Sequence, residues 1–260
     1  MSVLLIDIGN TRIKWARFDG KQLGRQRAAA HSGWSGEDYA RRVIGSARTL
    51  ERILVVSVAG ARIDRSIALA ARRARAPVPE FVASQRRAGG VTNGYLEPWR
   101  LGVDRFVASI GAHHLARGRA VCVVGVGTAM TIDLVDAKGH HQGGAIIPAP
   151  TLMVDTLLQN TNGIRRRAQG GGAGGNSLFG RSTRSAIVHG SRYAAAALID
   201  RAVGEARALV RGRLPLVVLT GGGAPSVQSL LKSTSVSVPD LVLRGLAVLC
   251  TQPAHPTPAA

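Results

Sequence analysis

Residues 3–15 read VLLIDIGNTRIKW. A continuous apolar run ends in the polar stretch that starts at Asp7, and an alternating run of apolar residues follows from Ile13 to Phe18. The first run predicts a buried strand, and the alternation predicts a second strand directly after it. The turn at Gly9 therefore lies between two strands, whereas P-loops and dinucleotide fingerprints place their glycines between a strand and a helix.

This turn has the composition of a phosphate-binding hairpin. Gly9 allows a backbone to approach a phosphate, and Asn10 and Thr11 offer hydrogen-bond donors. Asp7 is suited to hold a Mg²⁺ ion, directly or through water. Taken alone, the stretch is equally consistent with an ordinary hairpin that has a polar tip.

The same pattern occurs again at residues 121–135, which read VCVVGVGTAMTIDLV. Each copy closes with a turn signal, Asp19-Gly20 in the first and residues 136–139 in the second. Gly9 and Gly127 are 118 positions apart, so the repeat has the size of a domain. Two similar halves of this kind would face a nucleotide from both sides.

A third glycine motif follows another apolar run, LVVL at residues 216–219, and reads TGGGAP at residues 220–225. Three glycines after a strand allow flat backbone to lie against a ring such as adenine. A triple glycine is weak evidence alone, but the three motifs in this order predict a nucleotide site.

Together, the three motifs resemble the phosphate-1, phosphate-2 and adenosine motifs of the actin/hexokinase-like ATPase superfamily. The resemblance implies an α/β fold of two ribonuclease H-like halves, with mixed sheets flanked by helices. It also implies which residues bind ATP: Asp7, Ile8, Gly9, Asn10, Thr11, Arg12, Ile13, Lys14, Thr128, Gly221, Gly222 and Gly223.

Residues 94–106, GYLEPWRLGVDRF, narrow the resemblance. They are similar to the substrate segment of type III pantothenate kinases, which has Tyr, then Pro, then Gly-x-Asp-Arg and an aromatic residue. The resemblance extends from about residue 3 to about residue 248. It implies ATP-dependent phosphorylation of pantothenate to 4′-phosphopantothenate, the first step of coenzyme A biosynthesis, by a cytoplasmic homodimer that uses ATP with Mg²⁺.

Asp104 is the candidate catalytic base. Phosphoryl transfer to an alcohol relies on positioning and charge neutralisation, with one base directed at the attacking hydroxyl. Asp104 stands at the start of a predicted helix, where the helix N-terminus favours a carboxylate. The same position is typical of a helix N-cap, which is the structural alternative.

Substrate contacts are expected from Tyr95, Gly102, Val103, Asp104 and Arg105. The guanidinium of Arg105 is suited to bind the pantothenate carboxylate in a fork, and the Tyr95 hydroxyl to donate to the substrate amides. The alternatives are a surface charge for Arg105 and a half-buried packing aromatic for Tyr95.

Two positions of the second half bear on substrate and cation. Thr183 fits the family threonine that touches pantothenate, although Ser182 replaces the usual Asn, and either residue could instead be a helix N-cap. Many type III enzymes have Asp where this chain has Gly125, and the resemblance assigns that Asp to potassium or ammonium. Because Gly125 has no side-chain ligand, the sequence predicts weak dependence on a monovalent cation.

The chain is strongly basic, with 34 Lys and Arg against 15 Asp and Glu and a formal net charge of +19. Such an excess attracts polyanions. However, the arginines are dispersed, aromatic residues make up only 4%, and no zinc-finger or basic-zipper pattern occurs. We therefore expect a solvated basic surface, with weak, non-specific nucleic-acid binding as the alternative. Rival functions are a non-enzymatic accessory factor for transcription and a kinase for another small alcohol.

Composition favours a soluble enzyme domain. No apolar stretch reaches the ~18 residues of a membrane span, and no basic n-region precedes the first strand. Two cysteines, Cys122 and Cys250, form neither a metal cluster nor a disulfide framework, as expected in a reducing cytoplasm. The histidine pairs at 113–114 and 140–141 lack a third ligand at metal spacing, so we expect them to be structural.

The expected domains are residues 1–118 and 119–250, followed by a disordered tail at 251–260. Residues 160–179, with their glycine-rich stretch, are expected to form a flexible loop. The remaining expected helices are 35–50, 63–75, 104–117, 151–159, 183–210, one after Pro225 and one near 240–250; the remaining strands are 53–58, 80–83, 145–147 and 216–219.

Overall fold

The computed structural model describes residues 2–45, 49–170, 172, 174–175, 177–210 and 213–252. These residues divide into two compact units, one made of the residues up to 115 together with those from 240 onward, and one of residues 116–239. The last helix, which the sequence analysis placed in the second half, therefore belongs to the first unit. The tail expected to be disordered lies outside the described residues from position 253 onward.

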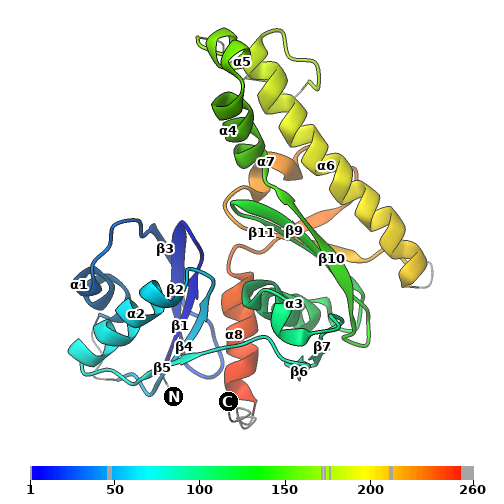
Figure 1. The fold of residues 1–260 in the computed structure, drawn as a ribbon. Helices are drawn as coiled ribbons and strands as arrows, with labels where there is room; N and C mark the ends of the chain where they lie inside the picture. Colours follow the sequence, from blue (N-terminus) through cyan, green and yellow to red (C-terminus); the bar gives the residue numbers. More distant parts are fainter. Residues whose placement is uncertain are drawn as a thin grey trace. The chain divides into compact units, whose positions relative to one another are not determined.

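Both units contain a five-stranded mixed sheet with the same strand order (Figure 1). In the first sheet the order is β3-β2-β1-β4-β5, and in the second it is β10-β9-β8-β11-β12. The first three strands of each unit along the chain, β1 to β3 and β8 to β10, are antiparallel to their neighbours. The other two strands of each sheet, β4 and β5 or β11 and β12, run parallel to β1 or β8. The duplication expected from the sequence is confirmed.

The strands that form these sheets are short. Their bounds are β1 Val3–Ile8, β2 Arg12–Phe18, β3 Arg27–Ala30, β4 Arg52–Ser57, β5 Pro79–Phe81, β8 Val121–Val126, β9 Ala129–Val135, β10 His141–Pro148, β11 Leu216–Thr220 and β12 Ser235–Ser237. A separate hairpin consists of β6 Arg87–Ala88 and β7 Val91–Thr92. The sequence pattern does not predict β3 or β12.

The helices agree with the sequence in type more than in length. Their bounds are α1 Gly36–Tyr39, α2 Ala61–Arg73, α3 Val103–Ala116, α4 Pro150–Asn160, α5 Asn162–Arg167, α6 Thr183–Leu209, α7 Ala224–Gln228 and α8 Leu241–Thr251. The helix expected at 35–50 is shorter, because α1 continues as a π-helical turn that ends at Gly45, which has a φ of 59°. Helix α5 occupies part of the stretch expected to be a loop.

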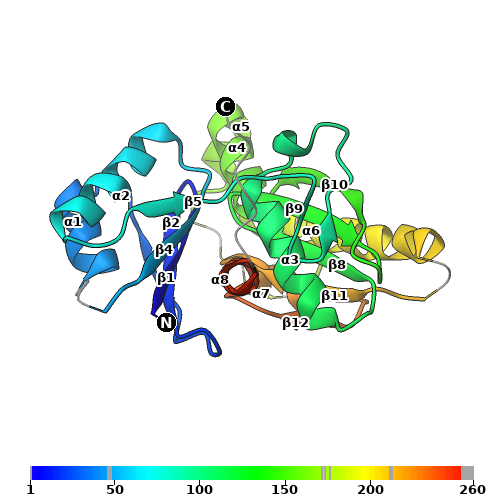
Figure 2. The ribbon, with the colours of Figure 1, turned by 90° about the horizontal axis from the view of Figure 1, so that it is seen from below.

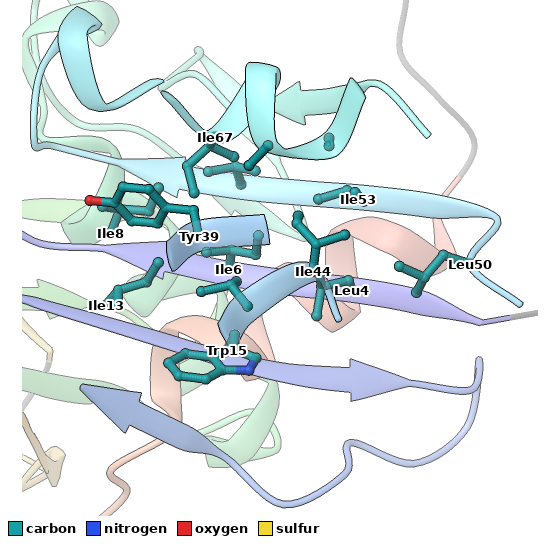
Figure 3. Packing of buried hydrophobic residues seen from close by; sticks show 14 residues of the cluster. Leu4, Ile6, Ile8, Ile13, Trp15, Tyr39, Ile44, Leu50, Ile53 and Ile67 are labelled. Atoms are coloured by element: carbon teal, nitrogen blue, oxygen red, sulfur yellow. The ribbon is translucent and has the colours of Figure 1, made fainter. Parts of the chain in front are cut away.

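The core of the first unit lies between the sheet and the helices α1 and α2 (Figure 3). Ile6 and Ile13 of the sheet pack with Tyr39, Ile44 and Ile67 from the helical side. Helix α8 packs against β1 and β4, on the other side of the sheet from α1 and α2 (Figures 1 and 2). Every residue of β1 is consequently buried, which explains why its sequence is an apolar run without alternation.

Helices α3 and α8 touch backbone to backbone. A Cβ atom at Gly245 would lie 2.0 Å from the Val107 carbonyl oxygen, and one at Gly111 would lie 2.5 Å from the Leu241 carbonyl oxygen. Only glycine fits at these two positions, since any side chain would force the helices apart. This contact fixes α3, whose first turn carries Asp104.

The second unit has its own core, in which residues of β8, β9 and β11 pack with α6 and α7. Val124, Met130, Ile199 and Leu219 are among its buried members. Among the described residues, none of the helices combines the length and apolar character needed to span a membrane.

Candidate functional site

The predicted site residues fall into two sets, one in each unit. Residues 7–14, Tyr95 and residues 102–105 belong to the first unit. Gly125, Thr128, Thr183 and Gly221 to Gly223 belong to the second.

The predicted phosphate-1 turn joins β1 to β2. The two strands pair up to Ile8 and Ile13, and the Gly9 N–H donates to the Arg12 carbonyl oxygen at 2.9 Å. A Cβ atom at Gly9 would lie 3.2 Å from that oxygen, so the turn is tight at this residue. Asn10 and Thr11 form its exposed tip, where their donors are open to a ligand.

Asp7 is a buried carboxylate, with 8% of the residue exposed, in an otherwise apolar strand. The Lys14 ammonium lies 3.6 Å from its Oδ2. Burial raises the pKa of Asp7 to about 6; the Lys14 charge opposes this rise, and the nearby Asp104 adds to it. Asp7 and Asp104 therefore carry like charges close enough to repel each other.

This pair of carboxylates fits a Mg²⁺ ion that arrives with a nucleotide. Mg²⁺ is commonly bound through one or two carboxylates, with phosphate oxygens and water completing its shell. Among the described residues, no group of three or more His, Cys, Asp and Glu side chains is placed to hold a metal by itself. Asp7 is the better placed ligand, since its desolvated charge gains most from a cation.

Asp104 is the second residue of α3. It therefore lies inside the first turn, and the alternative that it is a helix N-cap is wrong. A Cβ atom at Gly102 would lie 2.8 Å from Asp104 Oδ1, so a larger residue at 102 would displace the carboxylate. Asp104 Oδ1 accepts a hydrogen bond from the Arg105 N–H at 2.9 Å. These contacts hold the carboxylate at the positive end of the helix.

Arg105 and Tyr95 are paired. The Arg105 side chain is buried, its Nη1 donates to Tyr95 Oη at 2.9 Å, and its guanidinium carbon lies 5.6 Å from the centre of the Tyr95 ring. Arg105 is thus not a surface charge. Because Tyr95 Oη accepts in this hydrogen bond, its own proton can be donated to a second group.

Two residues that the sequence analysis missed hold the Tyr95 segment. The Arg86 guanidinium donates to the carbonyl oxygens of Asn93, Tyr95 and Leu96 at 2.9–3.1 Å. Asn93 is buried, donates to the Pro98 carbonyl oxygen and accepts from the Tyr95 N–H. In the sequence, Arg86 belongs to an Arg-Arg pair that indicates a solvated surface, so no local signal revealed this role.

In the second unit, the predicted adenosine loop packs against the predicted phosphate-2 turn. Gly221 has a φ of 93°, and a Cβ atom there would lie 2.3 Å from the Val126 carbonyl oxygen. The Gly223 N–H donates to that same oxygen at 3.0 Å. Gly222 has open space around it, and Thr128 is exposed at the tip of its turn. The two motifs therefore form one continuous surface within this unit.

Gly125 lies on β8 opposite Thr131 of β9. A Cβ atom at Gly125 would lie 2.9 Å from Thr131 Oγ1. A carboxylate at this position would require Thr131 to move, so the local packing matches the absence of a side chain.

Thr183 is the first residue of α6, and Ser182 is its N-cap in a capping box with Ser185. The N-cap alternative is therefore right for Ser182 and wrong for Thr183. A pocket of about 430 Å³ lies at this helix end, lined by Ser182, Ser185, His189 and the preceding glycine-rich loop among others.

The fold defines the class first: two units with matching mixed sheets, as expected from the resemblance to actin/hexokinase-like proteins. A structure from Campylobacter jejuni, described as a candidate Baf family transcriptional activator, has a TM-score of 0.58 at 17% identity over 94% of each chain. The activator of the 2-hydroxyisocaproyl-CoA dehydratase from Clostridium difficile, with bound ADPNP, has a TM-score of 0.50 at 14% identity, covering 96% of this chain and 93% of its own. At these identities the likeness shows the fold alone.

Sequence comparison then gives the family. The family model described as type III pantothenate kinase matches residues 3–205. The type III pantothenate kinase of Herminiimonas arsenicoxydans is 39% identical over 249 residues, which cover 94% of this chain and 95% of the relative. That of Nitrosococcus oceani is 35% identical over 253 residues, covering 94% and 92%. The chain belongs to the type III pantothenate kinase family, as the resemblance predicted.

The raised pKa of Asp7 gives a prediction for stability against pH. A carboxyl whose pKa rises on folding stabilises the folded protein below its unfolded pKa, and that stabilisation is lost as pH rises through the folded pKa near 6. In Asp7→Asn this loss is absent. We expect the free energy of unfolding of Asp7→Asn, relative to wild type, to rise by up to about 3 kcal/mol between pH 4 and pH 7.

Denaturant unfolding at several pH values measures this difference. Asp19→Asn is the control, because backbone N–H groups of Gln22 and Lys21 lower the pKa of the exposed Asp19. Its effect on stability should have the opposite sign, with stabilisation lost as pH falls. Parallel pH profiles for Asp7→Asn and wild type would contradict the prediction.

Proposed function

We propose that this protein transfers the γ-phosphoryl group of ATP to the 4′ hydroxyl of pantothenate. The product, 4′-phosphopantothenate, is the first intermediate of coenzyme A biosynthesis. Membership of the type III pantothenate kinase family supports the reaction. The observation that carries it in the structure is the set of Asp104, Arg105 and Tyr95, held together in one unit.

In this proposal Asp104 accepts the proton of the attacking hydroxyl. Its carboxylate is held by the first turn of α3 and does not serve as the N-cap of this helix. The carboxylate can therefore point to a substrate hydroxyl. Arg105 binds the carboxylate of pantothenate, and Tyr95 donates its hydroxyl proton to the substrate. Since the guanidinium and the phenol already touch, both are positioned before substrate binds.

The ATP contacts are proposed on the turns of both units. Donors of Asn10 and Thr11, at the exposed tip of the first turn, bind phosphate oxygens, as does the Thr128 hydroxyl, and Gly221 to Gly223 lie against adenosine. Lys14, already near Asp7, adds positive charge. Bound Mg²⁺, held by Asp7 directly or through water, would supply neutralisation of the phosphate charge.

A coupled assay of ADP release tests the function, with pantothenate and a panel of other small alcohols as acceptors. Pantothenate-dependent release with Mg²⁺ and ATP supports the proposal. Release with another acceptor only would favour a kinase of different specificity. No release with any acceptor, under any cation condition, would favour the non-enzymatic alternative.

Two substitutions separate the proposed role of Asp104 in catalysis from that of Arg105 in substrate binding. Asp104→Asn should lower kcat by about 10²–10⁴ with nearly unchanged ATP binding, as expected for loss of a general base. Arg105→Ala should mainly raise the KM for pantothenate, because it removes a ground-state contact. Steady-state kinetics measure both, with the exposed Arg62→Ala of α2 as the control. Wild-type turnover in Asp104→Asn would place the base elsewhere.

Gly125 predicts weak dependence on a monovalent cation. A carboxylate beside ATP phosphates is repulsive unless a cation lies between them, and this repulsion makes a site dependent on that cation. With Gly125, both the repulsion and the ligand are absent. We expect similar kcat/KM values in sodium, potassium and ammonium buffers. Strict activation of the wild-type enzyme by potassium or ammonium would contradict this expectation.

We expect the basic residues to form a solvated surface, and any nucleic acid that this surface binds to be held weakly and without sequence selectivity. In the first unit, Arg41 and Arg42 of the π-helical turn and four arginines of α2 are exposed on neighbouring elements. Binding of a mixed-sequence RNA should fall steeply between about 50 and 200 mM salt, because it depends on counterion release. Sequence-selective binding that survives high salt would revive the accessory-factor alternative. We also propose that the protein is a homodimer, as the resemblance implies. Analytical ultracentrifugation measures its oligomeric state.

A further inference from the structure

His31 makes direct contact with the predicted phosphate-1 turn. It follows β3, is 4% exposed, and has hydrogen bonds on both ring nitrogens. Nε2 lies 2.8 Å from the Gly9 carbonyl oxygen, and Nδ1 lies 2.8 Å from Tyr39 Oη. The His31 N–H also donates to the Thr11 carbonyl oxygen at 3.4 Å. One buried residue thus holds two carbonyl groups of the turn.

The directions of these hydrogen bonds follow from chemistry. A carbonyl oxygen only accepts, so His31 Nε2 carries the hydrogen and donates to Gly9. In the neutral ring Nδ1 is then an acceptor, and the Tyr39 hydroxyl donates to it. Burial raises the pKa of Tyr39, which keeps this hydroxyl protonated. The relay therefore runs from Tyr39 through His31 to Gly9.

Aromatic packing keeps the imidazole ring in place. The Trp34 ring stands edge-on to His31, with centroids 6.5 Å apart, and edge-on to Tyr39, with centroids 5.3 Å apart. The guanidinium of Arg42 lies 5.2 Å from the Trp34 ring. Rotation of the imidazole would break two hydrogen bonds and this packing together.

Fixing the Gly9 carbonyl also fixes the next N–H. In a planar trans peptide, the C=O of one residue and the N–H of the following residue point in opposite directions. Because the Gly9 C=O points to the buried His31, the Asn10 N–H points away from it, on the exposed side of the turn. Without His31, this peptide could rotate, since Gly9 has little conformational preference of its own.

We propose that His31 is a positioning residue for ATP, which together with Tyr39 fixes the Gly9–Asn10 peptide so that the Asn10 N–H meets a phosphate oxygen. The inference rests on the proposed function in that the ligand is a nucleoside triphosphate. His31 acts only through the turn and does not touch the nucleotide.

Direct binding of Mg·ATP, measured by calorimetry without pantothenate, tests the role of His31. His31→Ala should weaken binding roughly tenfold, since it removes a buried hydrogen bond and frees the peptide. His31→Gln should restore most of the affinity, because the glutamine Nε2 can donate to the Gly9 carbonyl from a similar place. Tyr39→Phe should weaken binding less than His31→Ala, because the ring loses only the group that selects its tautomer.

His114→Ala is the matched control. His114 Nε2 also lies within hydrogen-bond distance of a glycine carbonyl, at 3.1 Å from Gly89, but in the β6–β7 hairpin. We expect its Kd for Mg·ATP to equal that of wild type. In steady-state kinetics, His31→Ala should raise the KM for ATP and leave the KM for pantothenate unchanged, whereas a general loss of structure would alter both.

The outcomes are separable. If wild type does not bind Mg·ATP, the proposed function fails. If wild type binds and His31→Ala binds equally well, the proposed function stands and the positioning role is wrong. Should His31→Ala not fold, His31→Gln and Tyr39→Phe carry the test, and it fails if both bind as wild type does or if His31→Gln binds more weakly than Tyr39→Phe.

Discussion

The first unit depends on keeping a carboxylate inside a strand that is otherwise apolar. Asp7 lies on the central β1, which has helices on both sides, and its pKa rises to about 6 for that reason. Such burial is unfavourable unless a compensating charge is near. Lys14 provides part of that charge from the paired strand. Because Lys14 compensates the negative charge of Asp7 only in part, this position is suitable for a cation that accompanies a nucleotide.

The two sheets repeat the architecture but not this charge. Asp7 lies two residues before Gly9, and Gly125 lies two residues before Gly127, at the matching place in the second hairpin. The first position has a buried acid paired with Lys14, whereas the second has no side chain, and a Cβ atom added there would lie 2.9 Å from Thr131 Oγ1. The two matching hairpins therefore have different roles. One carries the charge, and the other brings its turn close to the glycine loop at residues 221–223.

Features with a local pattern could be predicted from the sequence. An apolar run, a turn and an alternating run predict each of the hairpins β1–β2 and β8–β9. The strand β3 could not be recognised, because its residues Arg27–Ala30 are mostly exposed and three of them are alanine. The place of α8 depends on backbone contacts with α3, between residues more than a hundred positions apart. No local signal contains that information.

The same distinction applies to the candidate site. Asp7, Asp104 and Arg105 stand in short motifs, so the sequence alone could single them out as candidates. Arg86, Asn93 and His31 act by donating hydrogen bonds to backbone carbonyl oxygens that lie 9, 5 and 22 positions away in the sequence. Any residue can offer such a carbonyl, so the partner leaves no mark in the sequence. Side chains that support the site through such hydrogen bonds can be identified only from a structure.

In the proposed reaction, the first unit directs one particular hydroxyl of pantothenate at ATP. Phosphorus and proton NMR of the product, formed from ATP, Mg²⁺ and pantothenate, tests it most directly. The expected product is a single phosphomonoester at the 4′ position, with no phosphorylated product from 4′-deoxypantothenate. Phosphate at another position, or turnover of the deoxy analogue to a phosphorylated product, would contradict it.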